Sequence, residues 1–185
     1  MELMDAIRQR RAVRDFTSEA VAEGSLRRAI EAACWAPSAT NEQPWLFTIV
    51  SNMDRLNSIS EQAKTYMRLR AGKSMPLRLA SQLSDPNFQI FHHAPALVVI
   101  STDSPTVWAI EDCALAAENF MLAAHAEGLG TCWIGLAQEW LGTPEGRQSL
   151  NLASGCLPVA PIIVGHAKTK PVTVPRRQPQ IHWLT

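Results

Sequence analysis

The chain has 185 residues, of which 46% are hydrophobic and 18% are charged. This length suits a single domain over residues 1–185 with a sizeable core, and the composition argues against a disordered chain. The 17 basic and 17 acidic residues give a net charge of zero. That balance argues against a general binder of nucleic acid or of membrane surfaces, because such proteins are normally basic overall.

In the first half of the chain, the hydrophobic spacing predicts both helices and strands. Apolar residues at helical spacing predict helices at 2–9, 25–35 and 54–70. Apolar and β-branched residues predict strands at 46–50 and 96–101. Residues 72–91 have no clear period, so we expect a short helical excursion or a mobile loop there.

The second half begins with a long alanine-rich helix, predicted at 106–127 and ended by Gly128 and Gly130. A strand is predicted at 131–134, a helix from Thr143, and a last core strand at 158–164. The final 20 residues contain three prolines and no helical period, which predicts an extended arm. Such an arm often embraces a second subunit. The whole order is a mixed α/β composition.

The four cysteines are scattered and show no spacing typical of a metal site. We therefore expect reduced thiols, a cytoplasmic location and no metal. The first residues carry charges where a signal peptide needs an apolar stretch, and no run of 18 apolar residues occurs. These features predict neither a targeting segment nor a membrane span.

Two basic clusters lie near the ends of the chain. Arg10, Arg11 and Arg14 follow the first helix, and Arg176 and Arg177 lie in the arm. Guanidinium groups match phosphate oxygens in bidentate pairs, so these arginines are candidates for binding an anionic ligand. The alternative for each cluster is a solvated basic surface.

A third cluster of polar residues lies between the second helix and the first strand. Pro37 and Pro44 bracket the side chains of Ser38, Asn41 and Gln43. Amide side chains both donate and accept hydrogen bonds, as the edge of a heteroaromatic ring requires. The alternative is an ordinary connecting loop that is rich in turn formers.

Glycines surround the third predicted strand. Gly128, Gly130 and Gly135 would let the backbone approach a flat ligand and leave N–H groups free to donate. This segment ends a helix and opens a strand, which excludes a Rossmann motif; the alternative is a simple junction between the two elements. No nucleophile, base or metal set is apparent, so any catalysis is expected to rely on a bound cofactor.

Taken in this order, the segments resemble the nitroreductase family of flavoproteins. The resemblance rests on IRQRRAVRDF at 7–16, APSATNEQPW at 36–45, APALVVI at 94–100, AAENFMLAAHAEGLGTCWIG at 116–135, PIIVGHAKTKP at 161–171, and PRR…W at 175–183. Only 72–91 has no counterpart. The resemblance implies an α+β fold with a central, mostly antiparallel sheet flanked by helices. It also implies a homodimer with exchanged C-terminal arms and FMN sites at the subunit interface, with 72–91 over the flavin.

The resemblance assigns roles to residues near the N-terminus. Arg10 and Arg11 resemble binders of the FMN phosphate and ribityl chain, and Arg14 resembles the cation at the flavin pyrimidine edge. Ala12 stands where the family usually has Ser, so one hydroxyl contact is absent. The cluster that would reach the flavin from the partner subunit comprises Pro37, Ser38, Asn41 and Gln43.

It also assigns roles near the third strand and in the arm. The N–H groups of Ile134 and Gly135 resemble the donors that face flavin N5 and O4. Cys132 and Trp133 would line that side, and Arg176 and Arg177 resemble the C-terminal phosphate clamp.

The implied function is that of an FMN-dependent NAD(P)H oxidoreductase. NADH or NADPH would pass hydride to flavin N5 and leave, and a nitroaromatic, quinone or enone acceptor would then bind in the same slot, which gives ping-pong kinetics. No side chain is assigned a catalytic role, because flavin N5 is the reactive atom. Two alternatives stay open. One is an oxygen-dependent or metabolite-specific flavin reaction, and the other is a non-enzymatic flavin-binding module.

Overall fold

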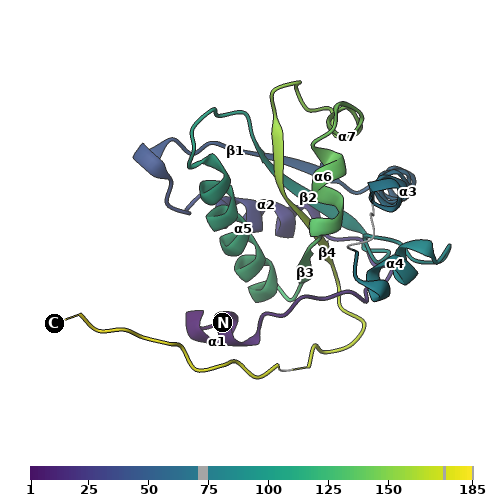
Figure 1. The fold of residues 1–185 in the computed structure, drawn as a ribbon. Helices are drawn as coiled ribbons and strands as arrows, with labels where there is room; N and C mark the ends of the chain where they lie inside the picture. The colour runs from purple at the N-terminus through teal and green to yellow at the C-terminus, as the bar shows by residue number, and fades with distance from the viewer. Residues whose placement is uncertain (71–74, 173, 185) are drawn as a thin grey trace.

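A four-stranded antiparallel sheet lies at the centre of the described chain (Figure 1). The computed structural model describes residues 1–70, 75–172 and 174–184. The strands pair in the order β1-β2-β4-β3. Their bounds are β1 Trp45–Val50, β2 Ala96–Thr102, β3 Gly130–Trp133 and β4 Leu157–Gly165. The predicted α+β class with an antiparallel sheet is thus confirmed.

Helices cover both faces of the sheet. One face packs against α2 and α5, and the other against α3 and α6. The helices are α1 Leu3–Gln9, α2 Glu23–Ala33, α3 Met53–Arg70, α4 Leu77–Ser84, α5 Ala109–Ala126, α6 Gly135–Leu141 and α7 Pro144–Ser149, and a 3₁₀ turn, η1, spans Ala39–Asn41. Within the described residues, no helix is long and apolar enough to cross a membrane.

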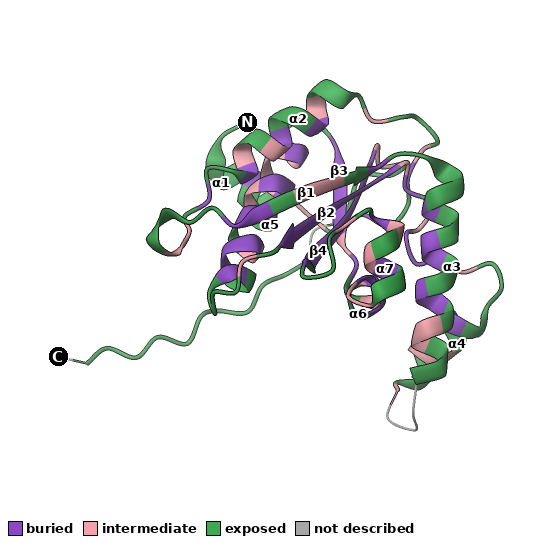
Figure 2. Cartoon of the chain, turned by 90° about the horizontal axis from the view of Figure 1, so that it is seen from above, coloured by how far each residue is buried: buried purple, intermediate pink, exposed green. Residues whose placement is uncertain are grey.

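The sheet divides the core into two layers. Alternate residues of β2 point to opposite faces, so Val98 and Ile100 pack on the α2–α5 side and Leu97 and Val99 on the α3–α6 side. All seven β2 residues are buried. Figure 2 shows buried strands between helices whose outer surfaces are exposed. Burial on both faces explains why this strand is continuously apolar rather than alternating.

The predicted elements are present with shifted ends, and one helix, α6, was not predicted. The long helix begins at Ala109 instead of residue 106, and α2 covers Glu23–Ala33 instead of 25–35. The sequence did not predict α6, which has only seven residues and therefore little room for a helical period. For residues 72–91 the sequence left two alternatives open, a short helical excursion or a loop. Residues 77–84 of this segment form the helix α4. Residues 72–74 lie outside the described residues.

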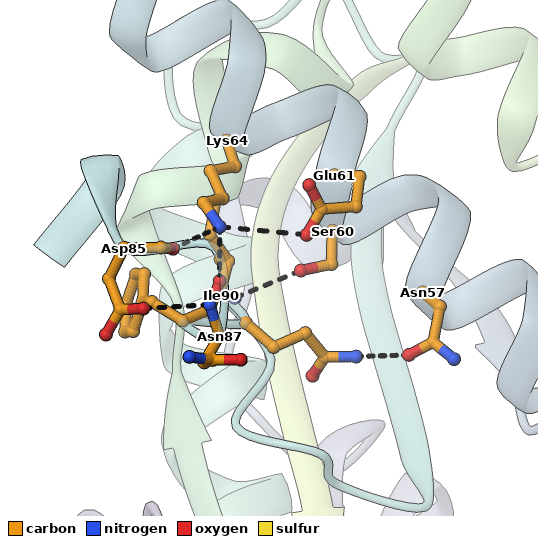
Figure 3. A network of polar contacts seen from close by, with 9 residues as sticks. Asn57, Ser60, Glu61, Lys64, Asp85, Asn87 and Ile90 are labelled. Carbon is orange, nitrogen blue, oxygen red and sulfur yellow. Dashed lines mark hydrogen bonds and ion pairs between the residues drawn. The ribbon is translucent and has the colours of Figure 1, made fainter.

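A buried lysine ties the segment after α4 to α3 (Figure 3). The Lys64 side chain is 4% exposed, and its Nζ lies 3.8 Å from Glu61 Oε1. Nζ donates to the carbonyl oxygens of Asp85 at 2.7 Å and Phe88 at 2.8 Å. Nearby, Ser60 Oγ accepts from the Ile90 N–H at 3.0 Å. The chain that leads into β2 is therefore held by side chains of α3.

The described part of the arm has no regular structure. From Lys170 to Leu184, the described residues are exposed and belong to no helix or strand. The arm leads away from the body past α1 (Figure 1). The extended arm predicted from its prolines is confirmed, whereas its exchange between subunits stays a prediction.

Replacing Lys64 by Met should lower the free energy of unfolding by about 2 kcal/mol, because two carbonyl groups lose a charged donor. Urea unfolding measures the loss, and hydrogen exchange should show faster exchange at the Ile90 amide. Arg68→Met, at an exposed site on the same helix, is the control and should change stability by less than about 0.5 kcal/mol. Equal stability of the two variants would contradict the anchoring role of Lys64.

Candidate functional site

The segment after α1 runs along the edge strand β3. The Val13 N–H donates to the Thr131 carbonyl at 2.9 Å, and Ala12 forms a parallel bridge with Thr131. A second bridge joins Phe16 to Ala167 just after β4. The structure thus brings the N-terminal arginines beside the glycine-bordered strand, as a common site requires.

Gly130 allows this close approach. A Cβ at Gly130 would lie 2.7 Å from Val13 Cγ2, closer than real Cβ atoms come to another carbon. Gly128 has a different role, because its φ of +81° makes the left-handed turn that ends α5. Gly128 therefore provides a turn, and Gly130 allows the segment after α1 to approach β3 closely.

A cavity of about 210 Å³ lies at this junction. Its lining includes Arg10, Arg11, His125 and Thr131. Six buried side-chain N or O atoms in the described chain have no hydrogen-bond partner, and four of them belong to these residues: Arg10 Nε, Arg11 Nε, His125 Nε2 and Thr131 Oγ1. Such atoms are costly to leave unpaired, so their grouping around one cavity indicates a ligand-binding site.

The polar groups of the cavity favour an anion. Arg11 Nη1 donates to the Arg10 carbonyl at 2.6 Å, and Arg10 Nε lies 3.4 Å from Glu118 Oε1 at the exposed side. Burial lowers the pKa of His125, and the charges of Arg10 and Arg11 lower it further. Two guanidinium groups with free donors and a hydroxyl group fit a phosphate group, whose oxygens only accept. The residues present therefore fit the phosphate end of FMN.

His125 and Thr131 were missed by the sequence reasoning. Both lie in the segment that supports the family resemblance, but neither was assigned a role. A histidine in the last turn of a helix is usually explained by the helix dipole. Only the folded chain shows that its ring meets the arginines.

The side chains of Cys132 and Trp133 in β3, expected to line the flavin side together, point to opposite faces of the sheet. Cys132 is buried in the α3–α6 core, and Trp133 packs against the opposite core. Burial raises the pKa of Cys132, so its thiol is protonated at neutral pH. Since neighbouring residues of a strand point to opposite faces, Cys132 and Trp133 do not line one surface together. Neither residue lines the cavity described above.

The backbone N–H groups of Ile134 and Gly135, which follow β3, differ in whether they are available to a ligand. The Ile134 N–H donates to the Pro161 carbonyl at 2.8 Å, so it is already engaged and is not a free donor to a ligand. Gly135 is exposed and begins α6, and no atom lies within 4 Å of a Cβ built on it. Of the two predicted donors, Gly135 is the one with open space beside it.

The Ser38 cluster lies at the other end of α5. The Gln43 N–H donates to Ser38 Oγ at 2.9 Å, and Gln43 Nε2 donates to Asn41 Oδ1 at 3.1 Å. The Ala39 N–H donates to Asp112 in the first turn of α5, whereas His125 is in its last turn. The 18 residues of α5 span ~27 Å, so one chain does not bring this cluster to the cavity. Pro37 is exposed at the same end.

The other three arginines predicted to bind the ligand are exposed. Arg14 follows Val13 on the solvent side of the segment, and Arg176 and Arg177 lie in the arm. Pro171, at the start of the arm, lines the cavity. Arg176 and Arg177 are not among the residues that line the cavity in the single chain.

The chain is an α+β protein with a cavity lined by two arginines at the sheet edge. The sequence matches the nitroreductase family over residues 7–166. The chain belongs to this family.

Similar proteins cover nearly the whole chain. A relative from Methanothermobacter thermautotrophicus, provisionally named NADH dehydrogenase/NAD(P)H nitroreductase, is 27% identical over 94% of this chain and 81% of its own. The FMN reductase [NAD(P)H] of Bacillus subtilis is 25% identical over 95% of this chain and 70% of its own. The crystal structure of an FMN-bound nitroreductase from Bacteroides fragilis is 26% identical, has a TM-score of 0.82, and covers 100% of this chain and 98% of that one.

Replacing Gly130 by Ala should weaken FMN binding at least tenfold, because the new methyl group pushes Val13 and the adjoining arginines away from β3. Fluorescence titration with FMN measures the dissociation constant. Gly155→Ala is the matched control, since a Cβ there meets nothing within 4 Å. Unchanged FMN affinity in a folded Gly130→Ala variant would contradict the importance of this contact.

Proposed function

We propose that this protein is an FMN-dependent NAD(P)H oxidoreductase of the nitroreductase type. The observation that carries the proposal is the cavity whose lining residues hold four buried polar atoms without a hydrogen bond, of which only Arg10 Nε has an ion-pair contact, with Glu118. Membership of the nitroreductase family and likeness to an FMN-bound structure support the same conclusion. The names of relatives as NAD(P)H-dependent enzymes support the choice of electron donor.

The chain's own residues would hold and orient the cofactor. Arg10 and Arg11 bind its phosphate with their free donors, and Thr131 adds a hydroxyl group. Arg14 supplies a positive charge toward the pyrimidine edge, and the Gly135 N–H supplies a neutral donor. When bound, FMN accepts hydride from NADH or NADPH and passes reducing equivalents to an acceptor such as a nitroaromatic, quinone or enone.

The kinetics would be ping-pong, because donor and acceptor use the same slot in turn. The side chains of the described site include no group that must act as a nucleophile, so the protein contributes position and electrostatics. The described part of the predicted excursion, residues 75–91, would lie over the flavin and select the acceptor. The Lys64 contacts would hold the described end of that segment in place.

A second copy of the chain would complete the site as a homodimer. The Ser38 cluster contacts α5 at Asp112, ~20 Å along the helix from His125 at the cavity, which suits a role in the partner's site. Large apolar side chains are exposed near that end, among them Trp35 at 82% and Trp108 at 59%. Exposed aromatic residues of this kind are typical of interfaces. The arm would then cross to the partner and bring Arg176 and Arg177 to the phosphate.

The purified protein should bind FMN, and NADH or NADPH should bleach the flavin absorbance within seconds in an anaerobic stopped-flow experiment. Arg10→Ala should weaken FMN binding about 10- to 100-fold, because it removes a charge-assisted contact worth about 1.5–3 kcal/mol. Arg27→Ala, on the exposed face of α2, is the control. Failure to bind FMN would overturn the proposal. Binding without bleaching by either nucleotide would favour the specialised reaction or the binding module.

Deleting residues 172–185 should weaken both dimerisation and FMN binding, because the arm carries interface contacts and two phosphate ligands. Light scattering after size exclusion reports the mass, and fluorescence titration reports the affinity. The double variant Arg176→Ala/Arg177→Ala should lose FMN affinity but stay dimeric. A truncated dimer with full FMN affinity would contradict arm exchange.

A further inference from the structure

Among the described residues that line the cavity, His125 alone has a side chain whose charge can change near neutral pH. It lies in the last turn of α5, and its Nε2 is buried without a partner. Arginine keeps its charge at every physiological pH, and threonine does not ionise in this range. Histidine ordinarily titrates near pH 6.5, so a change of its surroundings can switch its charge.

The ligand-free surroundings of His125 are positive. Arg10 and Arg11 face it from the N-terminal segment, and together with burial they lower its pKa. Met1 also lines the cavity, and its side chain carries no charge. From the arm, Ala167 and Pro171 line the cavity and bring no charge.

The nearby acids and the arm lysine are paired with other groups. Glu118 of α5 lies against Arg10, and Glu127 pairs with Arg28 of α2 at 2.6 Å. Lys168 pairs with Asp15 at 3.2 Å. Cys132 of β3 is protonated, because burial raises its pKa. The groups around His125 thus leave an excess of positive charge, and the neutral imidazole is the stable form above its lowered pKa.

We propose that His125 is the proton-accepting residue of the phosphate site, neutral in the free protein and protonated when the phosphate dianion of FMN fills the cavity. The proton comes from solvent and adds to the bare ring nitrogen. Both ring nitrogens then carry hydrogen, and Nε2 donates to a phosphate oxygen. The proposal rests on FMN being the ligand and goes beyond it, because it couples cofactor binding to pH.

The physical cause is a reversal of the local potential. Two negative charges beside the ring, together with the hydrogen bond from Nε2 to a phosphate oxygen, favour the imidazolium form more strongly than burial and the two guanidinium groups disfavour it. Ligand binding that favours the protonated form strengthens as the pH falls. At pH values between the lowered pKa of His125 in the free protein and its raised pKa in the complex, the FMN dissociation constant should rise up to tenfold for each unit by which the pH increases. At pH values below the pKa of the free protein, His125 is protonated in both states and adds no pH dependence.

The ligand has a titration of its own, with the opposite sign. A phosphate monoester loses its second proton near pH 6, so the dianion becomes more abundant as the pH rises. A variant that keeps a donor but cannot titrate separates the two effects. His125→Gln is that variant, and riboflavin, which lacks the phosphate, is the matched ligand. His93→Asn is the control at an exposed histidine that does not line the cavity.

Calorimetric titration of FMN at about pH 7, in two buffers of different ionisation enthalpy, counts the protons taken up. The wild type and His93→Asn should take up roughly half to one proton per FMN, whereas His125→Gln should take up none. Riboflavin binding should involve no uptake. Between pH 6 and 8, the FMN dissociation constant of the wild type should rise relative to that of His125→Gln by at least fivefold.

Histidine NMR on the wild type is the second measurement and depends on no variant. The His125 resonances should show a pKa below 6.5 without ligand and a higher pKa with FMN. FMN binding without proton uptake, or with equal uptake in His125→Gln, would overturn this proposal and leave the oxidoreductase proposal standing. Failure of the wild type to bind FMN would overturn both.

Discussion

The backbone contact between Val13 and Thr131 holds the site together. It joins the segment after α1 to the edge strand β3 and places two arginines against the end of α5. The contact depends on Gly130, because any side chain there would occupy the space of Val13. Gly130, which has no side chain, therefore decides where the arginines of the cavity lie.

The cavity shows how a fold can keep polar groups unsatisfied for a ligand. Elsewhere in the described chain, buried polar groups are mostly paired, as the contacts of Lys64 and Ser60 illustrate. Around the cavity, Arg11, His125 and Thr131 each keep a buried polar atom unpaired, and the buried Nε of Arg10 makes no hydrogen bond although it lies near Glu118. A rigid core on both faces of the sheet supplies the stability that offsets this cost.

The described chain contains only part of the predicted site in one place. The Ser38 cluster and the arm arginines lie away from the cavity, yet both carry groups suited to a flavin and its phosphate. The helix α5 separates the Ser38 cluster from the cavity, and no movement within one chain shortens this helix. A second copy is the simplest source of these groups, and in the proposed homodimer cofactor binding would depend on assembly.

The sequence by itself determined the order of the four strands and of the longer helices, the continuously buried strand β2, the extended arm and the arginine clusters. Each depends on neighbouring residues, since hydrophobic period, proline content and charge are local properties. Only the tertiary structure decided that His125 and Thr131 meet Arg10 and Arg11, that Cys132 and Trp133 face opposite cores, and that the Ile134 amide is already engaged. These facts depend on contacts between distant segments and on the direction of single side chains, which no local pattern specifies.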